Sequence, residues 1–286
     1  MSFLVLAIVA SVSVAIFLKL ARKWHIQIAQ AILVNYLTAI MLCFVLLKPS
    51  LTVGILEQGA WIFLALGVLL PSVFLIMSKA VDLVGIAKSD VAQRLSLFLP
   101  ILASFTLFGE SLTHAKGVGI ILAFGAMIAL TYKPINDEKN SQTKIGIKTT
   151  ALILSGVWVG YGVIDVLFKQ MSKLGGAFAN TLTVSFILAF VLLFGYLFIT
   201  KTRWQAKSLV SGVLLGVLNF ANILFYIKAH QAFKDDPTLV FAGMNIGVIC
   251  LGAVVGLFFF RERISKINGL GMMLGVLSVW CLFYLP

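Results

Sequence analysis

Long apolar stretches alternate with short polar segments along the whole chain. Each stretch is long enough to cross a hydrocarbon core of about 30 Å as an α-helix. The stretches are too long, and too apolar on every face, for the alternating barrel strands of about 9–11 residues. The pattern predicts an all-α integral membrane protein with ten transmembrane helices. The predicted helices cover residues 2–18, 28–47, 58–78, 91–109, 116–132, 149–170, 178–200, 208–228, 237–260 and 267–285.

Composition agrees with this fold class. Hydrophobic residues make up 61% of the 286 residues, against about 45–50% in soluble domains, and the mean hydropathy is +1.08. The first apolar stretch has no cationic segment before it, and Lys19 and Lys23 follow it instead. We therefore expect it to be a retained helix and not a cleaved signal peptide. Three widely spaced cysteines inside predicted helices favour neither a disulfide framework nor a metal site; they are Cys43, Cys250 and Cys281.

Two similar turns divide the chain into repeats. The segment "FGESLTHAKG" at 108–117 aligns with "FRERISKING" at 260–269, which pairs Glu110 with Glu262 and Gly117 with Gly269. Internal similarity of this kind is typical of duplicated folds. We predict a first five-helix repeat at 1–132, a polar linker at 133–148 and a second five-helix repeat at 149–286.

Charge predicts the orientation of these repeats. An odd number of helices per repeat inserts the second repeat upside down relative to the first. The segments after helices 1, 3, 5, 7 and 9 hold fifteen Lys and Arg residues, whereas those after helices 2, 4, 6 and 8 hold six. The positive-inside rule then places the first set in the cytoplasm and both termini outside. The net charge of +12 is thus explained by topology in a lipid bilayer, and no nucleic-acid partner is expected because the cations do not gather on one soluble face.

Ten helices in two inverted halves, each with a Glu-containing turn between its fourth and fifth helices, resemble the EamA-like branch of the drug/metabolite transporter superfamily. Pro100, ten residues before Glu110, also fits the family pattern, whereas the equivalent position in the second half is Gly252. The resemblance covers nearly the whole chain. It implies a small-solute carrier with a central cavity lined by helices 1, 3, 4, 6, 8 and 9.

Polar residues at helical spacing supply candidate solute contacts. They form stripes on three predicted helices, and stripes of this kind should face a wet cavity or the bundle interior because polar groups in lipid are costly. Gln93 and Asn245 are equivalent in the repeat, and aromatic residues beside amides are typical of solute pockets. The predicted substrate-binding residues are Gln93, Arg94, Trp158, Tyr161, Asp165, Asn219, Asn222, Tyr226 and Asn245.

Several of these residues also have a structural explanation. Amides inside helices often only join neighbouring helices, at about 0.6 kcal/mol each. Asp165 precedes Lys169 by four residues, which suits an ion pair along one helix. Arg94 could extend its charge to the membrane interface. Both interpretations of each residue stay open at the level of sequence.

Other residues are expected to shape the fold. Glu110 and Glu262 stand between helices, where helix capping or pairing with nearby cations is the expected role. Gly117 and Gly269 belong to the same structural motif. Pro71 and Pro100 should bend their helices, and the Gly-x-x-x-Gly spacing at 212 and 216 predicts a close approach between helices.

Enzyme signatures are absent from the sequence. There is no HExxH pair, no phosphate-binding loop and no GxSxG, so no enzyme, cofactor or metal is predicted. We interpret the chain as a secondary transporter that moves a small metabolite, such as an amino acid, across the bacterial inner membrane by alternating access, with export favoured and a coupled proton or ion as one energy source. The alternatives are a membrane enzyme acting on a lipid-linked substrate and a scaffold that does not transport.

Overall fold

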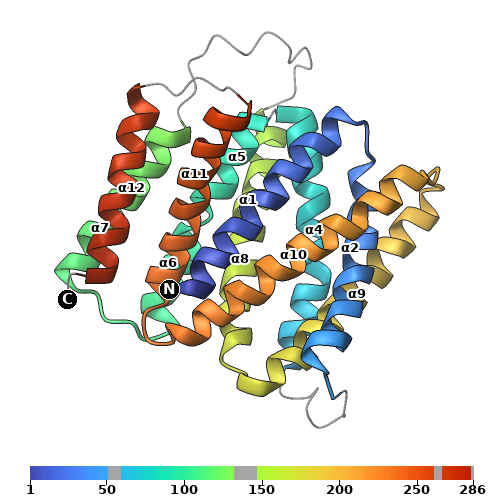
Figure 1. Cartoon of the computed structure of the whole chain (residues 1–286), viewed down its shortest axis with the longest axis horizontal. Helices are drawn as coiled ribbons and strands as arrows, with labels where there is room; N and C mark the ends of the chain where they lie inside the picture. Colours follow the sequence, from blue (N-terminus) through green and yellow to red (C-terminus); the bar gives the residue numbers. More distant parts are fainter. Residues whose placement is uncertain (51–58, 85, 132–146, 261–265, 285–286) are drawn as a thin grey trace. The chain divides into compact units, whose positions relative to one another are not determined.

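The computed structural model describes residues 1–50, 59–84, 86–131, 147–260 and 266–284 of the chain. These residues form helices and no strand (Figure 1). The α-helices are α1 (Ser2–Lys23), α2 (Ile28–Leu42), α4 (Ala60–Val84), α5 (Ile86–Leu95), α6 (Phe98–Thr106), α7 (His114–Thr131), α8 (Ile147–Ser172), α9 (Phe178–Ile199), α10 (Ala206–Ala232), α11 (Pro237–Phe260) and α12 (Lys266–Tyr284). A short π-helix, Cys43–Leu47, extends α2.

Seven of the described helical segments are long and apolar enough to cross a membrane, and they lie in α1, α2 with its π-helical extension, α4, α8, α9, α10 and α11. Three shorter apolar segments cover Val91–Thr106, His114–Ala129 and Gly269–Leu282. The chain is therefore a multi-pass integral membrane protein. Each of the ten predicted stretches overlaps one of these segments, although only seven have the full length of a membrane span.

The chain divides into two compact units. Unit 1 contains Met1–Ser72 and Leu167–Ala232, and unit 2 contains Val73–Val166 and Phe233–Pro286. The helices α4 and α8 each contribute to both units. The units therefore do not coincide with the predicted repeats 1–132 and 149–286, because each unit takes helices from both repeats.

Unit 1 is organised around α2, which packs against α9 and α10, while α1 packs along α10. Small residues allow α10 to lie close to α2. A Cβ atom added to Gly216 on α10 would lie 2.5 Å from the Cβ of Thr38 on α2. The buried ring of Tyr36 lies beside that of Phe186 on α9, with 6.2 Å between their centroids. The spacing of Gly212 and Gly216 thus marks a close helix contact, as the sequence pattern indicates.

Unit 2 is organised around a side-by-side pair of helices, α7 and α12 (Figure 1). The hydroxyl of Ser278 on α12 donates to the Gly119 carbonyl on α7 at 2.7 Å. The helix α11 packs against α6, α7 and α12, and its Ala242 and Ile246 join Ala123 and Leu282 in a buried cluster. This cluster fixes α11 to the α7–α12 pair.

The predicted helix at 91–109 is interrupted by a turn at Ser96 and Leu97, which separates α5 from α6. The cause is Pro100, because proline has no amide hydrogen to give to the carbonyl four residues earlier and its ring collides with that carbonyl. The Ser96 carbonyl instead accepts a hydrogen bond from the Leu99 amide at 3.0 Å. Pro71, in contrast, lies within a continuous α4.

Candidate functional site

The nine predicted solute contacts lie on four helices and divide between the two units. Asn219, Asn222 and Tyr226 lie on α10 in unit 1. In unit 2, α5 carries Gln93 and Arg94, α8 carries Trp158, Tyr161 and Asp165, and α11 carries Asn245. Tyr226 is buried, and the other eight are partly buried. The structure therefore groups these residues into two sets, one in each unit.

The set in unit 2 centres on the break between α5 and α6. The indole nitrogen of Trp158 donates to the carbonyl oxygen of Leu95, the last residue of α5, at 2.9 Å. This carbonyl belongs to a helix end, where intrahelical donors are missing. One turn further along α8, a Cβ added to Gly162 would lie 3.0 Å from the Ser96 carbonyl oxygen. Gly162 thus allows α8 to pack closely against the break between α5 and α6, and the Trp158 indole supplies a hydrogen-bond donor to the Leu95 carbonyl there.

Other members of this set make more local contacts. Tyr161 packs against the buried cluster of Ala80, Ala92 and Val157, which places it near the turn of α5 that carries Gln93. The amide nitrogen of Asn245 donates to the Phe241 carbonyl of its own helix at 3.1 Å. A bond of this kind satisfies the side chain without joining two helices.

The set in unit 1 forms a polar face along α10. The Tyr226 ring meets the Phe168 ring of α8 edge-on at 6.3 Å and the His230 ring at 4.7 Å. One turn earlier, the Oδ1 atom of Asn222 is buried and receives no hydrogen bond from the described residues. A buried acceptor without a donor costs about 1–3 kcal/mol. Among the described residues, this atom is therefore an unsatisfied hydrogen-bond acceptor on the polar face of α10.

Several other buried polar residues are not among the predicted solute contacts. Lys169 on α8 is 1% exposed and His230 on α10 is fully buried, although both continue the predicted polar stripes. Asp165 precedes Lys169 by one helical turn, the spacing at which charged side chains interact. Asn35 and Asn180 are also buried in unit 1. Both lie in largely apolar helices, where a buried amide is equally expected for contacts between helices.

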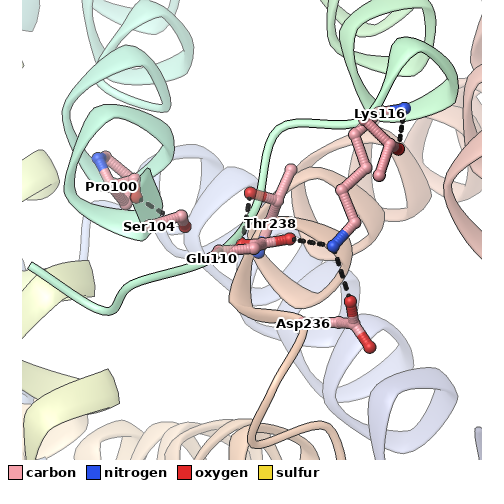
Figure 2. Close-up of polar contacts among 7 residues, drawn as sticks. Pro100, Ser104, Glu110, Lys116, Asp236 and Thr238 are labelled. Atoms are coloured by element: carbon pink, nitrogen blue, oxygen red, sulfur yellow. Dashed lines mark hydrogen bonds and ion pairs between the residues drawn. The ribbon is translucent and has the colours of Figure 1, made fainter. Parts of the chain in front are cut away.

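Glu110 belongs to a polar cluster in unit 2, together with Lys116, Asp236 and Thr238 (Figure 2). One carboxylate oxygen of Glu110 accepts hydrogen bonds from the Thr238 amide at 3.0 Å and from its hydroxyl at 2.8 Å. The other lies 2.9 Å from the Lys116 ammonium, which also contacts Asp236 at 2.7 Å. Glu110 thus caps the first turn of α11, where free amides favour an anion, and also pairs with a cation.

The turn before Glu110 explains how its side chain reaches α11. Gly109 has a positive φ of 69°, which glycine adopts without steric cost. The Glu110 amide then donates to the Ser104 carbonyl at 3.0 Å, and the Ser104 hydroxyl donates to the Pro100 carbonyl at 3.0 Å. The sequence predicts a capping role for Glu110 but does not show which residues it contacts. The one local signal for this site is Asp236 before Pro237, a pattern typical of the start of a helix.

The structure gives fewer contacts for the other motif residues, namely Glu262, Gly117 and Gly269. Glu262 lies outside the described residues, as does the linker up to residue 146. A Cβ added to Gly117 or Gly269 would meet no heavy atom within 4 Å. Neither glycine is therefore required by close packing. Among the described residues, no group of three or more His, Cys, Asp or Glu side chains could hold a metal ion.

Comparison with known proteins gives a relative and a shared fold. No protein-family model matches the chain. A solved structure described as the crystal structure of a protein aligns with a TM-score of 0.74 at 14% identity, over 99% of this chain and 96% of that one; at this identity the likeness shows the fold alone. A Haemophilus influenzae protein described as uncharacterized is 54% identical over 288 residues, which cover 99% of this chain and 97% of that protein. Near-complete coverage at this identity means that the chain belongs to the same family as the Haemophilus influenzae protein.

Proposed function

We propose that the protein is a ten-helix secondary carrier of the EamA-like type that moves a small amphiphilic metabolite, such as an amino acid, by alternating access. The observation that carries the proposal is the buried Oδ1 atom of Asn222, which has no donor among the described residues. It lies on a polar face of a long apolar helix, together with Asn219 and Tyr226. An ammonium or hydroxyl group of a solute would supply the missing donor.

Equivalent contacts in unit 1 support the proposed repeat. A Cβ on Gly67 would meet the Leu188 side chain, and a Cβ on Gly216 would meet Thr38, at 2.5 Å in both cases. Gly216 follows Gly67 by 149 residues, and Leu188 follows Thr38 by 150 residues. The two contacts are thus related by nearly the same shift in sequence, which supports the proposal that both halves have one fold.

Contacts between equivalent elements support a twofold relation between the halves. Tyr36 and Phe186 are 150 residues apart in the sequence, and their rings lie next to each other. Likewise α7 and α12, the last helices of the two predicted repeats, pack together. Equivalent residues meet where a twofold axis passes between them. Inverted repeats with such an axis are typical of secondary transporters, which place the solute near the middle of the membrane.

The solute contact is tested by Asn222→Ala. We expect the apparent affinity for the solute to fall about tenfold, because a hydrogen bond to a charged donor contributes about 1.5–3 kcal/mol and about 1.4 kcal/mol corresponds to a factor of ten. The amount of folded protein should stay the same, because this oxygen has no protein donor to lose. Solutes are first identified by metabolite profiling of cells with and without the protein, and affinity is then measured by counterflow into proteoliposomes.

Ser185→Ala is the matched control for this experiment. Ser185 is also buried in unit 1, but its hydroxyl donates to the Thr181 carbonyl of its own helix at 2.7 Å. Its loss should leave solute affinity unchanged. Unchanged affinity in Asn222→Ala, combined with less folded protein, would mean that Asn222 supports helix packing. The absence of counterflow for every solute found would argue against a carrier.

The orientation is tested by cysteine labelling. In a variant without Cys43, Cys250 and Cys281, a cysteine is placed at Lys48 or at Lys201, which are exposed at the ends of α2 and α9. An impermeant maleimide should label position 48 in intact cells and position 201 only after lysis, because the cation bias places the segment after helix 7 in the cytoplasm. The reverse labelling pattern would invert the proposed topology.

A further inference from the structure

The connection between α9 and α10 is held rigidly in unit 1 by one buried side chain. Gln30 on α2 is fully buried. Its amide nitrogen donates to the Arg203 carbonyl at 2.7 Å, and its amide oxygen accepts from the Gln205 amide at 2.9 Å. These bonds fix the backbone on both sides of Trp204. The exposed side chains of this connection therefore project from a fixed backbone.

An aromatic column continues from Trp204 along α9. The Trp204 ring stacks on Phe194 at 6.3 Å, and Phe194 stacks on Phe190 at 6.0 Å and on Phe198 at 6.2 Å. Trp204 is 46% exposed and Phe198 is 70% exposed. Tryptophan at the end of a membrane helix is typical of the membrane–water interface. Trp204 thus stands at the end of a column of apolar rings, the arrangement expected for a side chain at the level of the headgroups.

Three cations lie within three residues of Trp204 in the sequence, namely Lys201, Arg203 and Lys207, and all three are exposed. The Lys207 ammonium donates to the carbonyl oxygen of Trp24 at 3.2 Å, which brings a second exposed tryptophan to the same end of unit 1. No described residue of unit 1 is Asp or Glu. The described part of this unit thus offers the three cations no carboxylate.

We propose that Trp204 with Lys201, Arg203 and Lys207 forms a binding site for the headgroup of an anionic phospholipid. The phosphate would contact the cations, the indole would lie beside the glycerol region, and an acyl chain would follow the aromatic column of α9. Clusters of cations next to membrane helices attract anionic lipids. This site is independent of the proposed solute face, which lies further along α10.

The test measures lipid binding to the full-length protein in neutral detergent micelles. Thermal unfolding is followed while dioleoyl phosphatidylglycerol or dioleoyl phosphatidylcholine is added, because a ligand that binds the folded state raises the unfolding temperature. Phosphatidylglycerol should raise it and phosphatidylcholine should not. In the double variant Lys201→Gln/Arg203→Gln, we expect about 25-fold weaker apparent binding, about fivefold for each cation removed at a membrane surface.

Two further variants separate charge at this site from charge in general. Lys48→Gln/Lys173→Gln removes two exposed cations elsewhere in unit 1 and should keep the wild-type response. Lys201→Arg/Arg203→Lys keeps the charge and should also keep the response, which tests the site even if the Gln variant folds poorly. An equal loss in the Lys48→Gln/Lys173→Gln variant would overturn the proposal. So would an equal shift with phosphatidylcholine, or with inorganic phosphate, which would indicate a simple anion site.

Discussion

Gly212→Leu is expected to abolish folded protein. A Cβ at this position would lie 2.5 Å from the Ala31 carbonyl oxygen and 3.1 Å from the Ala31 Cα on α2. These are backbone atoms, which cannot rotate away as a side chain does. Extra atoms in a packed core typically cost about 1–3 kcal/mol. The smaller change Gly212→Ala should therefore lower the free energy of unfolding by about that amount.

Size-exclusion chromatography of a fluorescent fusion measures the folded fraction, and thermal unfolding in detergent measures the stability. Gly195→Ala on α9 is the control, because a Cβ there meets no heavy atom within 4 Å. Alanine favours helix over glycine by up to about 1 kcal/mol, so the control should be neutral or slightly stabilised. Equal unfolding temperatures for Gly212→Ala and Gly195→Ala would show that α2 and α10 do not approach this closely.

Glu110→Ala should have the second-largest effect on stability. The Glu110 side chain is 1% exposed and the Lys116 side chain 16% exposed, so alanine would leave an ammonium group in a mostly buried place and the Thr238 amide without its acceptor. Removing one partner of a buried ion pair costs about 3–5 kcal/mol, and the remaining exposure of Lys116 favours the lower end of this range. We expect folded protein to decrease more than the transport rate per folded molecule.

Two milder substitutions distinguish the parts of this cluster. Glu110→Gln keeps an oxygen acceptor for Thr238 and should cost less than Glu110→Ala. Asp236 is 46% exposed, and exposed ion pairs contribute about 0–1 kcal/mol, so Asp236→Asn should change the unfolding temperature only slightly. A larger loss in Asp236→Asn than in Glu110→Ala would refute the capping role. Normal abundance of Glu110→Ala with no transport would instead make Glu110 a coupling residue.

Much of the fold can be predicted from the sequence because the hydropathy of a segment depends only on the residues of that segment. An apolar stretch long enough to cross the membrane forms a helix whatever surrounds it, since backbone groups in lipid must be satisfied within the segment. Glycines spaced like Gly212 and Gly216 similarly indicate a close approach, and the structure places both against α2. The proline at position 100 indicates a local disturbance of its helix, which the structure resolves as a break between α5 and α6.

The tertiary structure alone decided which segments meet. Lipid and protein interior are both apolar, so the hydrophobic pattern of a helix such as α9 does not reveal which face packs inward. The carboxylate of Glu110 requires hydrogen-bond donors. Its donor Thr238 lies 128 residues later in the sequence, so the spacing of nearby residues could not identify it. The same holds for Gln30, whose two hydrogen bonds to the backbone around Trp204 span more than 170 residues. Sequence therefore determined the helices and their polar positions, whereas packing determined their partners, because contacts between distant residues depend on how all the helices fit together.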